Sequence, residues 1–269
     1  MTMFLKRKKT ETQFKFGKRP PRIDPRTFQL KTFLKVPLLP TLPKSFDVDK
    51  TLTKPIPTPM FANDKWGDCV IAGRAHQTLR FECFEEQQIL SISDQEVLNE
   101  YWNEQKSWCN LINNMRPHPD NGLVMLNSLN AWRRNGWTAA GKTYDIYAYA
   151  AVDRFNQNEI KYAIYLLEGM YAGIQVPQSA VDQFNQNKIW DDAGDNYILG
   201  GHAIYVKAFD STGLTCITWA KPQKMTWKFW LRYSDEVYGI IDNKDKWVQN
   251  SPVDVVLLDQ YLHEIIGGK

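Results

Sequence analysis

The sequence of 269 residues has no run of about 18 apolar residues, the shortest length that spans a bilayer as a helix. Its basic first residues are followed by no apolar stretch of the kind that marks a secretory signal. We therefore expect no membrane partner, and a location in the cytoplasm or in a virus particle.

Cysteine is scarce, and the four cysteines are far apart, at positions 69, 83, 109 and 216. No Cys-x-x-Cys pair occurs, so the sequence favours neither a disulfide framework nor a structural zinc site. No group of His, Cys, Asp and Glu has the spacing typical of metal ligands. We therefore expect no metal and no cofactor.

A clear hydrophobic period is missing from the first 59 residues. Residues 1–35 carry eleven Lys and Arg against two acidic residues, whereas the other 234 residues have a net charge of −6. Residues 36–59 contain six prolines, which exclude a continuous helix. The sequence thus predicts a basic, Pro-rich, extended N-terminal arm (1–59), a domain at 60–258 and a C-terminal tail at 259–269.

This arm allows several interpretations. It could be a solvated tail or a segment that docks on an acidic protein surface. It could also bind nucleic acid, because Lys6–Lys9 can contact phosphates and the rings of Phe14 and Phe16 can stack on bases. Since an arm of this composition cannot build its own core, we expect it to pack along the domain or on a neighbouring subunit.

Beyond residue 60 the pattern is α+β, with helices first. Apolar residues at helical spacing predict helices at 69–90, 94–105, 123–135 and 158–168. Short apolar runs bounded by turn residues predict strands at 170–176, 202–209, 214–219, 237–242 and 253–258, with a short helix at 226–236. Asp68 and Ser93 stand where helix N-caps are expected.

Two distant segments carry the chemistry. Cys69 follows Gly67 and Asp68 at a predicted helix start, where the helix dipole and free amides favour a thiolate. His202 follows Gly200 and Gly201 at the start of a strand and can serve as the base of a cysteine nucleophile.

The other histidines are weaker candidates for the base. His76 lies two turns along the same helix, about 10 Å from Cys69 at 1.5 Å per residue, so a role within the helix is favoured. His118 lies in a predicted loop and His263 near the C-terminus, and neither has a cysteine nearby in the sequence.

The order of these segments resembles the papain-like cysteine peptidases. In that family a glutamine six residues before the cysteine helps to form the oxyanion hole, and Asn63 has this spacing here. The family's Asn-His-Ala-Val strand resembles the residues at 201–204, and its Asn-Ser-Trp-Gly segment resembles those at 217–220.

The resemblance covers residues 58–258. It implies an α+β fold in which a helical half carrying Cys69 packs against an antiparallel β half carrying His202. It also implies catalytic positions at Cys69, His202, Asn63 and Thr218. The residues flanking them would bind substrate, namely Trp66, Gly67, Asp68, Gly201 and Trp219.

One departure affects the third catalytic position. The family's asparagine orients the imidazole, but here Ile217 occupies the aligned place and Thr218 is the nearest polar residue. Residues 217 and 218 point to opposite faces of a strand, so only one of them can face His202.

Two functions therefore remain open. The first is a papain-like cysteine peptidase or amide hydrolase that acts on a peptide or protein substrate, with oxyanion donors from Asn63 and the Cys69 amide. The second is a catalytically degenerate structural protein of a larger assembly, such as a phage virion, in which the basic arm binds protein partners.

Overall fold

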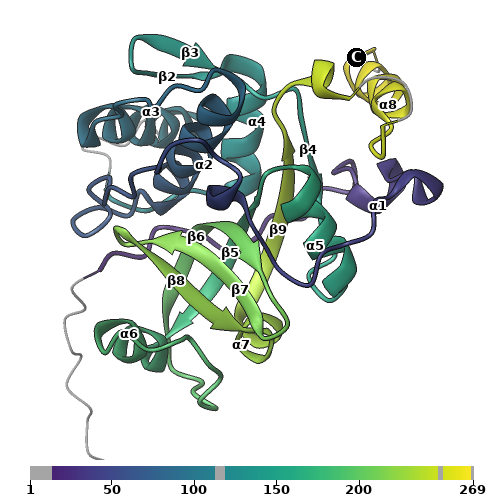
Figure 1. The fold of residues 1–269 in the computed structure, drawn as a ribbon. Coiled ribbons are helices and arrows are strands. Elements are labelled where there is room, and N and C mark those ends of the chain that lie inside the picture. Colours follow the sequence, from purple (N-terminus) through teal and green to yellow (C-terminus); the bar gives the residue numbers. More distant parts are fainter. Residues whose placement is uncertain (1–13, 113–118, 248–250, 268–269) are drawn as a thin grey trace, which may run out of the picture.

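The computed structural model describes residues 14–112, 119–247 and 251–267, and it has a helical half and a sheet half (Figure 1). The helical half contains α2 (Cys69–Glu85), α3 (Asp94–Ile112) and α4 (Met125–Asn135). A small hairpin of β2 (Trp137–Ala139) and β3 (Lys142–Tyr144) follows α4.

Local signals in the sequence place the ends of these helices. Ser93 and Glu96 form the predicted capping box before α3, because the Ser93 amide donates to the Glu96 carboxylate over 2.7 Å and the Glu96 amide donates to Ser93 Oγ over 3.3 Å. Gly136, at φ 65°, ends α4. A buried guanidinium ties α2 to α3, since Arg74 forms ion pairs with Glu100 and Glu104.

The sheet half is one antiparallel sheet in the order β4-β9-β5-β6-β7-β8, with β1 paired to β6. Its strands are β1 (Phe46–Asp47), β4 (Ala148–Ala151), β5 (Met170–Pro177), β6 (Ile198–Phe209), β7 (Gly213–Thr218), β8 (Lys221–Thr226) and β9 (Ser234–Ile241). The remaining α-helices are α1 (Leu30–Phe33), α5 (Gln157–Leu166), α6 (Gln178–Asn185), α7 (Trp227–Tyr233) and α8 (Val255–Gly267).

Strand alternation divides the apolar side chains of the sheet between two buried clusters. In β6, Ala203 belongs to the cluster under α2 and α4, whereas Ile204 and Val206 belong to the cluster that includes α5 and α7. Both clusters therefore meet at β6, the strand that carries the histidine.

The N-terminal segment packs along the domain. In Figure 1 its purple part passes between the helical half and the sheet and reaches α1 on the other side. Leu30 and Phe33 of α1 and the nearby Val48 are buried in the larger cluster. Buried cations hold the following stretch, because Lys207 pairs with Asp47 over 2.6 Å and Arg80 pairs with Asp49 over 2.9 Å.

The C-terminal region corrects one prediction. The expected strand at 253–258 is wrong, because α8 begins at Val255. Leu258 and Leu262, four residues apart, are buried on one face of this helix, and the Asp254 side chain accepts a hydrogen bond from the Leu257 amide at its start. The short apolar run fitted either structure, and the capping aspartate was the signal for a helix. The predicted helix at 226–236 is shorter, since it ends at Tyr233 and β9 follows.

No helix in the described ranges is long and apolar enough to cross a membrane.

Candidate active site

Cys69 is the first residue of α2 and is buried, with 1% of its surface exposed. The glycine turn before it is held from α3, because the Gly67 amide donates to both oxygens of Asp120, and Asp120 accepts a hydrogen bond from the Tyr101 hydroxyl. A side chain at position 67 would lie 2.9 Å from the Asp120 carboxylate. The turn therefore needs glycine, and it fixes where the cysteine enters the helix.

His202 lies in β6 and is also buried, with 1% of its surface exposed. Its Nε2 and the Thr218 hydroxyl are hydrogen-bonded at 2.7 Å, so Thr218, and not the buried Ile217, faces the imidazole. Thr218 is the last residue of β7, and the two-residue turn of Trp219 and Ala220, both at positive φ, joins it to β8. This turn lays the Trp219 indole on the imidazole, with centroids 4.7 Å apart.

The cysteine and the histidine strand meet directly. The Ala203 amide donates a hydrogen bond to Cys69 Sγ over 3.4 Å, so the residue after His202 touches the thiol. His202 Nδ1 is buried and has no hydrogen-bond partner among the described residues. The ring nitrogen that Thr218 does not use is therefore available to accept a proton.

Burial keeps both groups neutral in this conformation. It raises the pKa of Cys69 to about 11, although amide donors from Ala203 and Gly17 oppose the shift. It lowers the pKa of His202 to about 3. A buried thiol and a buried neutral imidazole do not form the charged pair that reacts fastest.

Asn63 and Asp68 are engaged with each other. The Asn63 side-chain amide donates to Asp68 Oδ1 over 2.9 Å and to the Trp66 carbonyl over 3.2 Å, so both its hydrogens are used. Burial raises the pKa of Asp68 to about 8. Asp68 occupies the predicted N-cap position of α2, but its side chain makes no capping hydrogen bond and accepts one from Asn63 instead.

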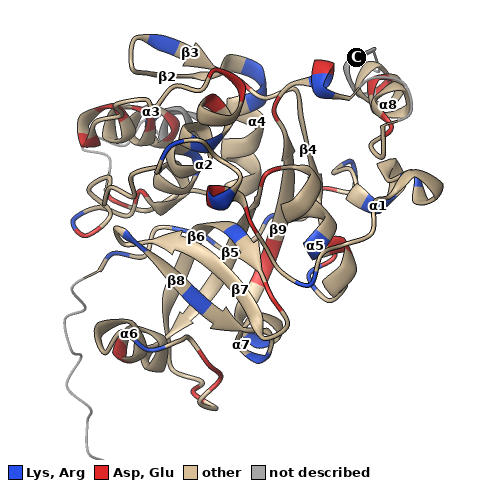
Figure 2. Cartoon of the chain, in the orientation of Figure 1, with Lys and Arg blue, Asp and Glu red and all other residues tan. Residues whose placement is uncertain are grey.

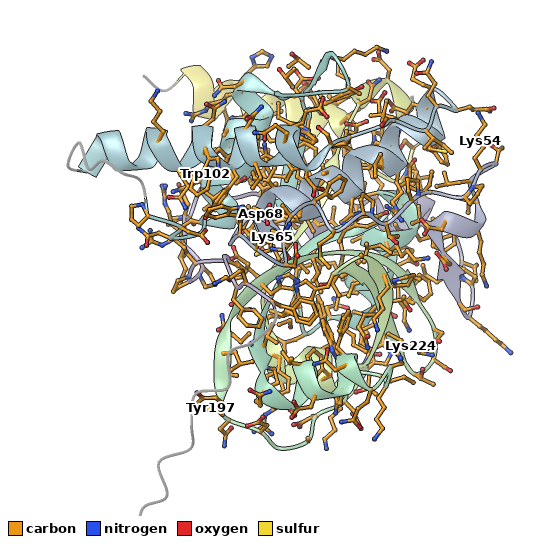
Figure 3. All side chains as sticks on the ribbon, turned by 90° about the vertical axis from the view of Figure 1, so that its left-hand side faces the viewer. Lys54, Lys65, Asp68, Trp102, Tyr197 and Lys224 are labelled. Carbon is orange, nitrogen blue, oxygen red and sulfur yellow. The ribbon has the colours of Figure 1, made fainter. Side chains whose placement is uncertain are left out.

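Trp66 lies on the surface and contacts α3. It is 38% exposed and packs edge to face on Trp102 of α3, with centroids 5.3 Å apart. Figure 3 shows Asp68 and Lys65 at the junction of the two halves, with Trp102 beside them. Substrate contact through Trp66 stays a prediction.

The cleft between the two halves is filled by the chain's own N-terminal segment. The Lys18 amide donates to the Gly201 carbonyl over 3.0 Å on one wall. On the other wall the Leu123 amide donates to the Gly17 carbonyl over 2.7 Å, and the Arg19 amide donates to the Leu123 carbonyl over 2.8 Å. Residues 17–19 thus add an extended strand between both walls, as a bound peptide does.

The fit leaves no space around this segment. A Cβ on Gly17 would lie 1.6 Å from the Gly67 carbonyl oxygen. Phe14 stacks on Trp219, with centroids 4.2 Å apart, and Phe16 covers Gly200. The sequence signal was the alternation of Phe14, Phe16 and Lys18 around a glycine. Their partners, which are indole and backbone, could not be identified from the sequence.

The other histidines lie elsewhere. His76 is buried against Phe61, with ring centroids 4.9 Å apart, and burial holds its pKa well below the usual value. His118 lies outside the described residues. Within the part of the chain that the structure describes, no three His, Cys, Asp or Glu are grouped as metal ligands.

Comparison with solved structures identifies the fold. Xylellain, a cysteine protease from Xylella fastidiosa, superposes with a TM-score of 0.65 at 15% identity, over 90% of this chain and 100% of that one. This chain has the papain-like fold. A procathepsin B from Trypanosoma congolense gives a TM-score of 0.55 at 12% identity, over 86% and 87% of the two chains. A cysteine protease of Carica candamarcensis gives 0.50 at 13% identity, over 75% and 100%.

At these identities the likeness establishes the papain-like fold alone, and the predicted α+β class is confirmed. No protein-family model matches the sequence, and no curated protein matches it either. The roles of Cys69, His202, Asn63 and Thr218 within the papain-like fold therefore depend on their geometry.

Proposed function

We propose that this protein is a cysteine peptidase, or a closely related amide hydrolase, that is latent while residues 14–19 fill its cleft. The observation that carries the proposal is the meeting of three elements at one point. Cys69 at the start of α2 touches the Ala203 amide, and the preceding residue, His202, is held by Thr218. The papain-like fold of the named proteases supports peptide or protein substrates.

Departure of residues 14–19 of the arm from the cleft would prepare the pair for reaction. Because burial is the main cause of both pKa shifts, admitting water lowers the pKa of the Cys69 thiol and raises that of His202. The proton can then pass from Sγ to Nδ1, which gives a thiolate beside an imidazolium. Thr218 would hold the ring through Nε2 during this transfer.

The reaction then follows from the geometry. The thiolate attacks the substrate carbonyl carbon, and the Cys69 amide, in the first turn of α2 where helix amides lack internal partners, stabilises the oxyanion. The imidazolium gives its proton to the leaving amine, which leaves a thioester on Cys69. Water hydrolyses the thioester to a free acid and restores the thiol. Asn63 would act as a second oxyanion donor only after it releases Asp68 or Trp66.

Alkylation of Cys69 tests this proposal. The full-length chain with Phe14→Ala and Gly17→Ala, which loosens the arm, should react with iodoacetamide at Cys69 at least about tenfold faster than the parent chain, because the thiolate forms only in the open cleft. It should also hydrolyse a quenched peptide library. The same chain with His202→Ala should lose most of the rate, and with Cys69→Ser all of the hydrolysis.

Slow alkylation in the loosened variant, with no effect of His202→Ala, would contradict the proposal. That outcome would leave the alternative, a degenerate structural protein of an assembly such as a virion whose basic residues bind protein or nucleic acid. No contact among the described residues favours this alternative over the hydrolase.

A further inference from the structure

The Lys18 side chain leaves the cleft and enters a closed acidic pocket in the sheet. Its ammonium is fully buried and lies 3.0 Å from Asp235 and 2.9 Å from Glu236, with the Arg19 carbonyl at 3.1 Å. The ammonium thus donates hydrogen bonds to Asp235 and to the Arg19 carbonyl, and it forms an ion pair with Glu236. The red part of β9 in Figure 2, on a largely uncharged sheet, is this acidic pair.

The pocket is shaped for a long side chain. Gly173 of β5 forms its floor, because a Cβ there would lie 2.1 Å from Lys18 Cε and 2.6 Å from an Asp235 oxygen. Each carboxylate also accepts a hydrogen bond from a side chain other than Lys18, since Gln175 donates to Asp235 and the Tyr238 hydroxyl donates to Glu236 over 2.9 Å. The carboxylates therefore keep their places when the lysine leaves.

Strand register places this pocket next to the thiol. Gly173 pairs with Ala203 on one side and with Glu236 on the other, and the Ala203 amide touches Cys69 Sγ. Neighbouring strands are about 4.8 Å apart, so Glu236 lies two strand spacings, or about 10 Å, from the strand that touches the nucleophile. An extended peptide spans this distance with two or three residues.

We propose that the pocket of Gly173, Asp235 and Glu236 selects substrates with a lysine or arginine side chain near the bond to be cleaved, and that Lys18 occupies it in the latent protein as an imitation of that side chain. The selectivity rests on the proposed function, because only a hydrolase has a substrate to select. Occupation of the pocket by a cation does not depend on the proposed function.

Electrostatics supports a cationic occupant. Glu236 is 95% buried as a side chain, and burial raises its pKa, an effect that Lys18 partly offsets. Two carboxylates side by side in a buried pocket repel each other, and a cation removes this cost. A neutral side chain of the same length would leave the two carboxylates without a counter-charge, so it should bind much more weakly.

Peptide binding tests the pocket independently of catalysis. The full-length chain with Phe14→Ala and Lys18→Ala loses both main anchors of the arm. A fluorescein-labelled peptide with the sequence of residues 13–22 should bind it, by anisotropy, at least about tenfold more tightly than the same peptide with norleucine at the position of Lys18. Norleucine at the position of Lys15, which is exposed, should leave the affinity unchanged.

Substitutions in the pocket provide the matched control. Added to that background, Glu236→Gln should reduce the difference between the two peptides to less than about threefold, whereas Asp182→Asn, at an exposed carboxylate of α6, should preserve it. In hydrolysis assays of the same variants, substrates with lysine should be preferred over norleucine by a similar ratio in kcat/KM.

The outcomes separate the two proposals. Equal affinities for the lysine and norleucine peptides, or no binding of the lysine peptide up to millimolar concentration, would overturn the pocket. Selective binding without hydrolysis of any substrate would retain the cation pocket and reject the hydrolase. Hydrolysis without preference for a basic side chain would retain the hydrolase and reject the selectivity.

Discussion

Replacing Thr218 by valine removes the hydroxyl that holds His202 and changes almost nothing else. Valine has nearly the same shape, so no cavity forms. The hydrogen bond between the two side chains is 2.7 Å long and buried, and Nδ1 of the same ring has no partner among the described residues. The Thr218→Val protein would therefore hold a buried imidazole with neither nitrogen satisfied.

The expected loss in the free energy of unfolding is about 1–3 kcal/mol, the cost of leaving one buried polar group unpaired. Each kcal/mol lowers Tm by about 2–4 °C in a chain of this size. Thermal and urea unfolding measure both quantities. In the variant with the loosened arm, Thr218→Val should also slow alkylation of Cys69, because the imidazole is no longer held in place.

Thr218→Ser is the matched control, since it keeps the hydroxyl and loses a buried methyl group, at about 0.5–1.5 kcal/mol. Alkylation should then stay close to that of the parent chain. If Thr218→Val were as stable and as reactive as the parent while Thr218→Ser was impaired, the methyl group and not the hydrogen bond would be what matters at this position.

Three further predictions concern Asp68, Gly17 and Leu30. Burial raises the pKa of Asp68 from 3.8 to about 8, so its contribution to stability is complete below pH 3.8 and is lost as pH rises through 8. Asp68→Asn should remove this loss when the free energy of unfolding in urea is measured between pH 5 and 9. If the dependence of that free energy on pH is the same in the variant and the parent, Asp68 titrates normally. Gly17→Ala alone places a methyl group 1.6 Å from the Gly67 oxygen, so it should displace the arm and speed alkylation of Cys69, and an unaltered rate would mean that the arm does not protect the thiol. Leu30→Ala removes a fully buried side chain and should cost about 2–5 kcal/mol in urea unfolding; a loss below 0.5 kcal/mol would mean that α1 is not part of the core.

The sequence predicted the fold because its decisive signals are local. The glycine turn before Cys69, the capping box at Ser93 and the glycine after α4 each act within a few residues, and all three lie where the structure has helix ends. The run at 253–258 was misassigned because a short apolar segment fits a strand or a helix equally well; the capping Asp254 and the burial of Leu258 with Leu262 favour the helix.

The candidate site was predictable only in part. The positions of Cys69 and His202 follow from chain order, but whether Thr218 or Ile217 faces the imidazole depends on how the β7–β8 turn sets the strand's face. The side-chain pairing of Asn63 with Asp68 and the entry of Lys18 into an acidic pocket join residues up to 218 positions apart. No periodicity in a single sequence specifies such pairs, because their energy comes from burial in the finished fold.

The anchoring of Leu30 and Phe33 in the core has a consequence for competition in the cleft. Only about ten residues separate this anchor from Lys18, so the arm is a ligand on a short tether. Such a tether gives an effective concentration in the millimolar range. A free peptide with the same intrinsic affinity must reach that concentration to displace the arm, because its apparent affinity is its intrinsic affinity multiplied by the fraction of molecules whose cleft is open. The arm would therefore discriminate against dilute peptides and favour a substrate that is itself held close to the cleft.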